Sequence, residues 1–236
     1  NAQGDKFSDE DTAKIEAALK AEDFSLSPDN IGQVTEVPDA VVAYLDKVLP
    51  IVGTDEQPLK GLRIVLDCAN GAFYKIMPEI YKNLGAGVIA LAHEPDGCNI
   101  NKDCGSQHID TMLNVVKEAH AHLGIACDGD GDRIIVCNEK GEKVASEQLI
   151  AFIAQSMKEQ GVLNNRPVVS TIVSNTGLDS FIRSLGVEYY ATKVGERYVI
   201  EKMKEVKAAV GGEESGHVVL GDYSKTGDAL VVGLFL

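Results

Sequence analysis

The strongest constraint on the fold is an alternation of hydrophobic patterns that begins near Leu59. Residues 62–68 form a continuous run rich in β-branched side chains, typical of a strand buried on both faces. After the Asn70-Gly71 turn, apolar residues recur at helical spacing: Ile76, Met77, Ile80, Tyr81 and Leu84. Gly85 follows them and predicts the C-cap of a helix.

The alternation continues along the chain. We expect strands at 88–92 and 123–127, separated by a helix whose apolar face carries Ile109, Met112, Leu113 and Val116. This order predicts a βαβ unit. Residues 134–138 precede a Lys140-Gly141 turn, which predicts a strand that returns antiparallel in a hairpin.

A second alternation starts at Leu149. Its expected elements are a helix at 149–157 ended by Gly161, a strand at 168–173, a helix at 178–185, a strand at 187–191, a helix at 196–206 and short strands at 208–210 and 217–220. The fold class is therefore α/β, with two consecutive α/β domains of mixed sheets flanked by helices and joined near residues 143–147.

Two short amphipathic helices are expected before this region. The first covers residues 9–21 and is opened by Ser8 or Asp9, the second covers 38–49, and a polar stretch separates them. The chain begins without Met and ends in the apolar run 229–236, where a helix would normally continue. We expect a segment of a longer protein.

Charge and composition exclude several classes. Asp and Glu outnumber Lys and Arg by 36 to 22, and the formal charge of −14 opposes binding to nucleic acid or to an anionic membrane. No apolar run is long enough to span a bilayer, and the first ten residues do not resemble a signal peptide, so we expect a cytoplasmic protein. The five cysteines include no CxxC pair and are expected to be reduced. A zinc site of Cys98, Cys104 and His108 has no usual spacing and is disfavoured.

The acidic sequence Asp128-Gly129-Asp130-Gly131-Asp132-Arg133 is the sharpest functional signal. Three carboxylates separated by single glycines repel one another, and a hard cation such as Mg²⁺ offsets that repulsion. Arg133 adds a planar fork suited to phosphate. The alternatives are a solvated acidic turn and an EF-hand. The EF-hand is disfavoured because Arg133 stands at position six, where Gly is needed.

A second polar loop is Gly211-Gly212-Glu213-Glu214-Ser215-Gly216-His217, between two expected short strands. We expect it to display Glu213, Ser215 and His217. Carboxylate and hydroxyl groups bind sugar hydroxyls, and His217 could donate to phosphate or move a proton. Taken alone, a Gly-rich acidic segment is more often only a turn.

The chain resembles the α-D-phosphohexomutase family. The resemblance rests on KGLRIVLDCANGA at 60–72, on the DGDGDR loop at 128–133, on TKVGERYV at 192–199, on GEESGH at 212–217 and on TGD at 226–228. It implies that residues 1–36 are the tail of a first domain, 37–144 a second domain with the metal loop, and 145–236 a third domain with the sugar-binding loop.

The resemblance also implies roles. A family enzyme exchanges a phosphoryl group between a serine and the 1- and 6-positions of a hexose or hexosamine phosphate, with Mg²⁺ as cofactor. The implied metal ligands are Asp128, Asp130 and Asp132. The implied catalytic residues are Arg133 and His217. The implied sugar-binding residues are Gly195, Glu196, Arg197, Glu213 and Ser215.

Two departures from the family accompany these roles. The phosphoserine loop and the fourth-domain phosphate loop have no counterpart in the sequence, so we expect the segment alone to be inactive and to need the first and fourth domains as partners. Glu196 also stands where similar family sequences usually have Asp. Three readings stay open: a mutase segment for glucosamine, mannose or glucose phosphates, a phosphatase with an Asp nucleophile, and a non-catalytic sugar-phosphate-binding module.

Overall fold

The computed structural model describes residue 4, residues 6–21 and residues 33–236, and these fall into two compact units, 1–47 and 48–236. In the first unit, α1 (Asp9–Lys20) begins after Ser8, whose side chain accepts a hydrogen bond from the Asp11 backbone. α2 (Ala40–Val48) is the second predicted helix. Both helices are confirmed, whereas most of the polar stretch predicted between them lies outside the described residues.

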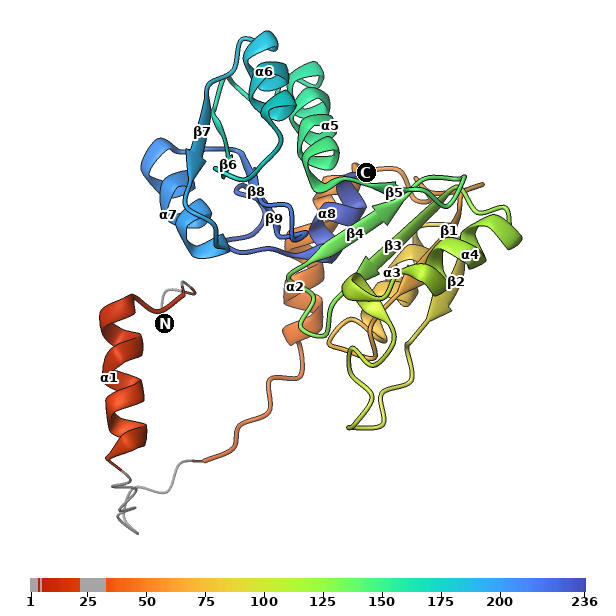
Figure 1. Cartoon of the computed structure of the whole chain (residues 1–236). Coiled ribbons are helices and arrows are strands. Elements are labelled where there is room, and N and C mark those ends of the chain that lie inside the picture. The colour runs from red at the N-terminus through yellow and green to blue at the C-terminus, as the bar shows by residue number, and fades with distance from the viewer. Residues whose placement is uncertain (1–3, 5, 22–32) are drawn as a thin grey trace. The chain divides into compact units, whose positions relative to one another are not determined.

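The second unit contains two sheets, and the first has the strand order β2-β1-β3-β4-β5 (Figure 1). β1 (Arg63–Asp67), β2 (Gly87–Leu91) and β3 (Leu123–Cys127) are parallel. β4 (Ile134–Cys137) and β5 (Lys143–Val144) are antiparallel, so the predicted βαβ unit and hairpin are confirmed.

Helices cover both faces of this first sheet. α4 (Asp110–Glu118) packs on one face, with Met112 and Val116 against Val65 and Ile135. On the other face lie α3 (Ile76–Asn83) and α8 (Ala229–Phe235), where Gly233 is packed against Tyr81. The short 3-10 helices η2 (Leu49–Val52) and η3 (Gly105–Gln107) complete this part.

The second sheet has the order β7-β6-β8-β9. β6 (Val168–Thr171) is parallel to β7 (Tyr189–Thr192) and to β8 (Val210–Gly212), and β9 (Val218–Leu220) is antiparallel to β8. α7 (Glu196–Val206) covers one face, and α5 (Ser146–Glu159) with α6 (Thr176–Ser184) covers the other (Figure 1).

The predicted fold class, two α/β arrangements of mixed sheets flanked by helices, is confirmed. Several predicted strand bounds are wrong by one or two residues, among them that of β7, which starts at Tyr189 instead of Val187. Two of these differences have a clear cause. β6 ends at Thr171, because Ile172 and Val173 turn to solvent. β8 starts at Val210 and includes Gly211 and Gly212, where Met203 of α7 and Ile150 of α5 occupy the space that side chains would need.

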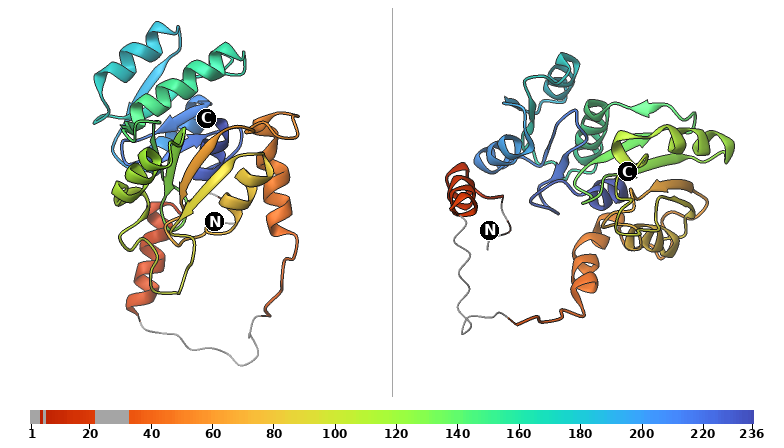
Figure 2. Two further views of the ribbon diagram at one scale, coloured as in Figure 1. Left: turned by 90° about the vertical axis from the view of Figure 1, so that its right-hand side faces the viewer. Right: turned by 60° about the horizontal axis from the view of Figure 1, so that its bottom comes forward.

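α8 joins the two sheets. It packs against β4 of the first sheet and β9 of the second, and in both views of Figure 2 it lies beside the green strands. Its N-cap Asp228 accepts hydrogen bonds from the backbone of Leu230 and Val231. Within the described residues, no helix has the length and apolar character needed to cross a bilayer.

Candidate active site

The acidic loop connects β3 to β4, directly after the buried residue Cys127. Two of its contacts fix its path. Gly131 has a positive φ of 77° and lies against the Phe73 ring, so a larger side chain does not fit. Ala72 donates its backbone N–H to the Gly129 carbonyl oxygen at 2.7 Å. The loop is therefore held by the turn that follows β1.

That turn depends on Asp67, a buried carboxylate at the end of β1. It accepts backbone hydrogen bonds from Ala69 and Gly105, each at 3.0 Å. Burial raises the pKa of Asp67, and the two backbone hydrogen bonds oppose this rise. Asp67 is not among the predicted site residues, although a carboxylate at the end of a buried strand is a signal of a structural or functional role.

The structure brings Asp128, Asp130 and Asp132 together. One oxygen from each lies within 4.8 Å of the others, a spacing that would let all three reach one ion. Burial, and then the neighbouring carboxylates of Asp132 and Asp128, raise the pKa of Asp130. The three charges are therefore close enough to disfavour one another.

Arg133 is tied to the first of these carboxylates. Its Nε donates to Asp128 Oδ2 at 2.6 Å, and its backbone N–H donates to Asp128 Oδ1 at 3.1 Å. Within the described part of the chain, its two terminal nitrogens take part in no hydrogen bond. Arg133 thus offers a positioned cation beside the acidic loop.

The second loop lies between β8 and β9, and one prediction for it is wrong. Glu213 is buried, with 7% of its surface exposed, instead of being displayed. The reason is its set of donors: Gly195 N at 3.1 Å to Oε2, and Ser215 Oγ at 2.6 Å to Oε1. Ser215 itself is exposed and lines a cavity of about 490 Å³ together with Lys143 and Ser146.

His217 connects the two loops. Its Nε2 lies 3.2 Å from Asp132 Oδ1, and its Nδ1 lies 2.9 Å from Glu213 Oε1. The backbones also meet, since Arg133 and His217 form a β-bridge and Ile134 N donates to Gly216 O at 2.9 Å. Burial alone would lower the pKa of His217, but the hydrogen bond and charge of Asp132 outweigh it, and the pKa is raised.

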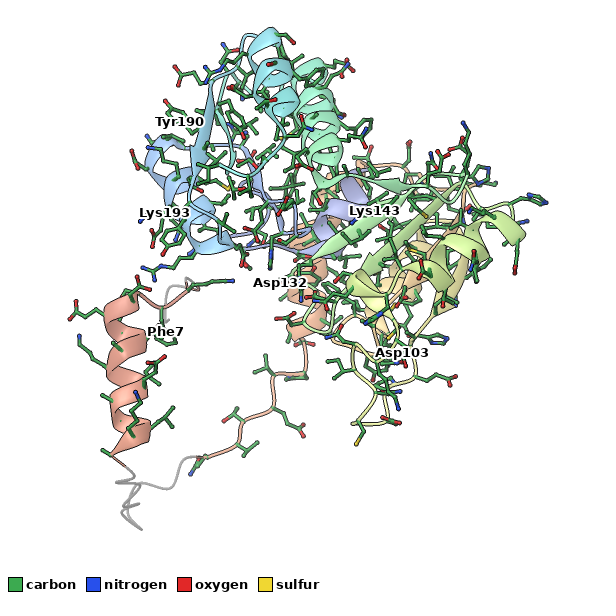
Figure 3. The ribbon with its side chains drawn as sticks, in the orientation of Figure 1. Phe7, Asp103, Asp132, Lys143, Tyr190 and Lys193 are labelled. Atoms are coloured by element: carbon green, nitrogen blue, oxygen red, sulfur yellow. The ribbon has the colours of Figure 1, made fainter. Side chains whose placement is uncertain are left out.

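Glu196 adds a third segment to this centre. It begins α7, is 6% exposed, and its Oε1 accepts from Thr226 Oγ1 at 2.7 Å and from Gly227 N at 2.9 Å. Its Oε2 lies 4.0 Å from His217 Nε2. His217 Nε2 thus lies close to both Glu196, at the start of α7, and Asp132, which is labelled in Figure 3.

Arg197 has a different environment from the other predicted sugar-binding residues. Its Nε pairs with Glu201 at 2.8 Å along α7, and its guanidinium lies 6.0 Å from the Tyr198 ring centre.

The disfavoured zinc ligands Cys98, Cys104 and His108 do not form a metal-binding group among the described residues. The groups that do form are Asp128, Asp130 and Asp132, and Asp132, Glu196 and His217.

Two sequence models of one family match the chain. Residues 42–141 match alpha/beta/alpha domain II of phosphoglucomutase/phosphomannomutase, and residues 145–236 match domain III. A phosphoglucosamine mutase from Gluconacetobacter diazotrophicus is 43% identical over 233 residues, covering 98% of this chain and 51% of that relative. Another, from Carboxydothermus hydrogenoformans, is 42% identical over 239 residues, covering 100% and 53%. The chain spans about half the length of these curated relatives.

Solved structures agree in fold. A phosphoglucomutase/phosphomannomutase family protein from Burkholderia thailandensis has a TM-score of 0.77 at 24% identity, covering 97% of this chain and 48% of that one. The Aspergillus fumigatus N-acetylphosphoglucosamine mutase in complex with GlcNAc-6P and magnesium has a TM-score of 0.59 at 17% identity, covering 81% and 49%. With its sequence matches and its fold in agreement, this chain belongs to the phosphoglucomutase/phosphomannomutase family.

Proposed function

We propose that this chain supplies the metal-binding and sugar-binding loops of a phosphoglucosamine mutase, which interconverts glucosamine 6-phosphate and glucosamine 1-phosphate. The observation that carries the proposal is the direct contact between the two loops, with His217 Nε2 3.2 Å from Asp132 Oδ1. The curated relatives that share this region support the choice of hexosamine phosphate as substrate.

The acidic loop fits Mg²⁺. Its donors are carboxylate oxygens, which Mg²⁺ prefers, and their mutual repulsion falls when a dication lies among them. Asp128, Asp130 and Asp132 would hold the ion, which would offset negative charge on a transferring phosphoryl group. The solved structure of the Aspergillus fumigatus N-acetylphosphoglucosamine mutase in complex with magnesium supports this choice.

The protein groups around the loop have separate tasks. Arg133 is held by Asp128, so its terminal nitrogens are positioned to bind phosphate oxygens. His217 is held between Asp132 and Glu213 and can hold a proton at Nε2 near the reacting group. Exposed Ser215 would contact a sugar hydroxyl directly, whereas buried Glu213 orients Ser215 and His217.

The proposal extends to the rest of the protein. We assign residues 37–144 to a domain that carries the metal loop and 145–236 to a domain that carries the sugar loop, with residues 1–36 from a preceding domain. Gly195, Glu196 and Arg197 would line the sugar site. A first and a fourth domain would supply the phosphoserine and most of the phosphate contacts, and the enzyme would act in the cytoplasm.

The test is a mutase assay on the full-length gene product. We expect conversion of glucosamine 6-phosphate to glucosamine 1-phosphate with Mg²⁺, and a loss of about 100-fold or more in kcat for Asp132→Asn. Faster conversion of a mannose or glucose phosphate would show that this sugar phosphate, and not glucosamine phosphate, is the substrate. Release of inorganic phosphate without isomerisation would favour a phosphatase, and binding with neither reaction would favour a non-catalytic module.

A further inference from the structure

A second group of metal-binding side chains lies beside the acidic loop. His217 Nε2 is 3.2 Å from Asp132 Oδ1 and 4.0 Å from Glu196 Oε2, and one donor atom from each residue lies within 4.8 Å of the others. We propose that His217, Asp132 and Glu196 bind Zn²⁺ at a site that is distinct from the three-carboxylate magnesium loop and shares only Asp132 with it.

The partner of the second ring nitrogen favours this assignment. His217 Nδ1 lies 2.9 Å from Glu213 Oε1, and an ionised carboxylate can only accept, so Nδ1 carries the proton. In the neutral ring, Nε2 then bears the lone pair and points toward Asp132. A carboxylate that holds the distal N–H is the usual companion of a metal-binding histidine.

The contact between His217 and Asp132 itself requires a cation. A lone pair on Nε2 and a carboxylate oxygen at 3.2 Å repel each other unless a proton or a metal ion lies between them. A proton would join only His217 Nε2 and Asp132 Oδ1. A metal ion would in addition bind Glu196 Oε2, which lies 4.0 Å from His217 Nε2.

Glu196 is already held for such a role. Its carboxylate is buried, and Oε1 is fixed by Thr226 Oγ1 and Gly227 N, so Oε2 is the oxygen that faces His217. In a tetrahedral zinc site with bonds of about 2.0–2.1 Å, neighbouring donor atoms are about 3.3 Å apart. The His217 and Glu196 donors, 4.0 Å apart, need to approach by about 0.7 Å, and the Asp132 and Glu196 donors, which lie within 4.8 Å, by about 1.5 Å at most.

The donor set selects the metal. One imidazole with two carboxylates suits Zn²⁺, and the three protein ligands leave a fourth position open. Mg²⁺ prefers oxygen ligands alone and is directed to Asp128, Asp130 and Asp132. Because Asp132 belongs to both groups, binding of one ion should weaken binding of the other. This antagonism does not depend on the proposed mutase activity.

The experiment is calorimetric titration of Zn²⁺ into this chain in a Cys98→Ser background, which removes the exposed thiol. We expect one zinc site, with affinity reduced by about tenfold or more in His217→Gln and in Glu196→Gln. The matched control is Asp130→Asn, which changes the magnesium loop and keeps all three proposed zinc ligands, so it should reduce zinc affinity by less than either ligand substitution. Added Zn²⁺ should also raise the apparent Kd for Mg²⁺.

A second measurement guards against misfolded variants. Zinc added to the unsubstituted chain should change the ¹⁵N chemical shift of His217 Nε2. The ¹⁵N chemical shift of Nδ1 should stay in the range of a protonated ring nitrogen. The proposal is overturned if zinc does not bind, if His217→Gln binds it as tightly as the unsubstituted chain, or if Asp130→Asn abolishes binding. The last result would place zinc in the three-carboxylate loop.

Discussion

Gly227 should control the geometry of the acidic loop although it contributes no side chain. A Cβ at this position would lie well under 3.0 Å from the Asp132 carbonyl oxygen and 3.2 Å from its carbonyl carbon. Both neighbours are backbone atoms, so no flexible side chain can move aside. An ordinary contact requires a displacement of about 1 Å, either of the acidic loop or of the segment that leads into α8.

We therefore expect Gly227→Ala to lower the free energy of unfolding by about 1–3 kcal/mol, the usual cost of overpacking. Because the shift falls on the Asp132 backbone, the apparent Kd for Mg²⁺ should rise by about tenfold or more. Urea unfolding and calorimetric titration measure the two effects.

The control for Gly227 is Gly87→Ala. A Cβ there meets its nearest atom, the Leu62 carbonyl oxygen, at 3.6 Å, which is an ordinary contact. It should leave metal affinity unchanged. The reasoning about the loop fails if Gly227→Ala unfolds at the same urea concentration as the control and binds Mg²⁺ with the original affinity.

Three further predictions concern the contact between Tyr81 and Gly233, the Arg166–Asp222 pair and the reactivity of Cys98. Tyr81→Phe should stabilise the protein by ~1 kcal/mol in urea unfolding, because the buried Tyr81 Oη has no hydrogen-bond partner among the described residues. Gly233→Ala should lower the free energy of unfolding by ~1–3 kcal/mol, because its Cβ would lie 2.5 Å from the same Tyr81 oxygen. The Tyr81→Phe, Gly233→Ala double variant should recover this loss, and additive effects of the two substitutions would contradict the contact. Arg166 lowers the pKa of Asp222, so the stability from this pair, ~1 kcal/mol or less, is present above pH 3.8 and lost as the pH falls below it. A stability difference between the unsubstituted chain and Asp222→Asn that persists in strong acid would be incompatible with this. Cys98 alone should react rapidly with a thiol reagent in the native state, because the other four cysteines are buried; modification of a second cysteine before unfolding would refute this.

Local patterns were sufficient for most of the fold. The strand at 123–127 and the helix at 196–206 have the bounds that the sequence predicts, because each combines an unbroken hydrophobic period with clear ends. β8 was misplaced because Gly211 and Gly212 have no side chains to carry a period. Their place in the strand depends on Met203 and Ile150, which fill the space above and below them.

The residue types of the candidate site could be predicted, but their contacts could not. Repelling carboxylates after a strand indicate a metal loop whatever surrounds them. The contact between Asp132 and His217 joins loops of two different sheets, and no local spacing reports it. The burial of Glu213 has the same origin, since its donor Gly195 comes from the start of another helix.

Asp130 should affect stability and metal binding in opposite directions. Partial burial of the carboxylate, and then its neighbours Asp132 and Asp128, raise its folded pKa above the ordinary 3.8. An acid with a raised folded pKa favours the folded state below its unfolded pKa, and this contribution is lost as the pH rises through the folded value. At neutral pH and without metal, Asp130→Asn should therefore raise the free energy of unfolding by a few tenths of a kcal/mol, a small effect because the side chain is exposed. The same substitution should abolish the rise in Tm that we expect Mg²⁺ to give the unsubstituted chain. Asp55→Asn, an exposed aspartate outside the loop, should change neither quantity. If Asp130→Asn lowers the metal-free Tm, the carboxylate stabilises the loop by other contacts, and repulsion among the three aspartates is not what the cation offsets.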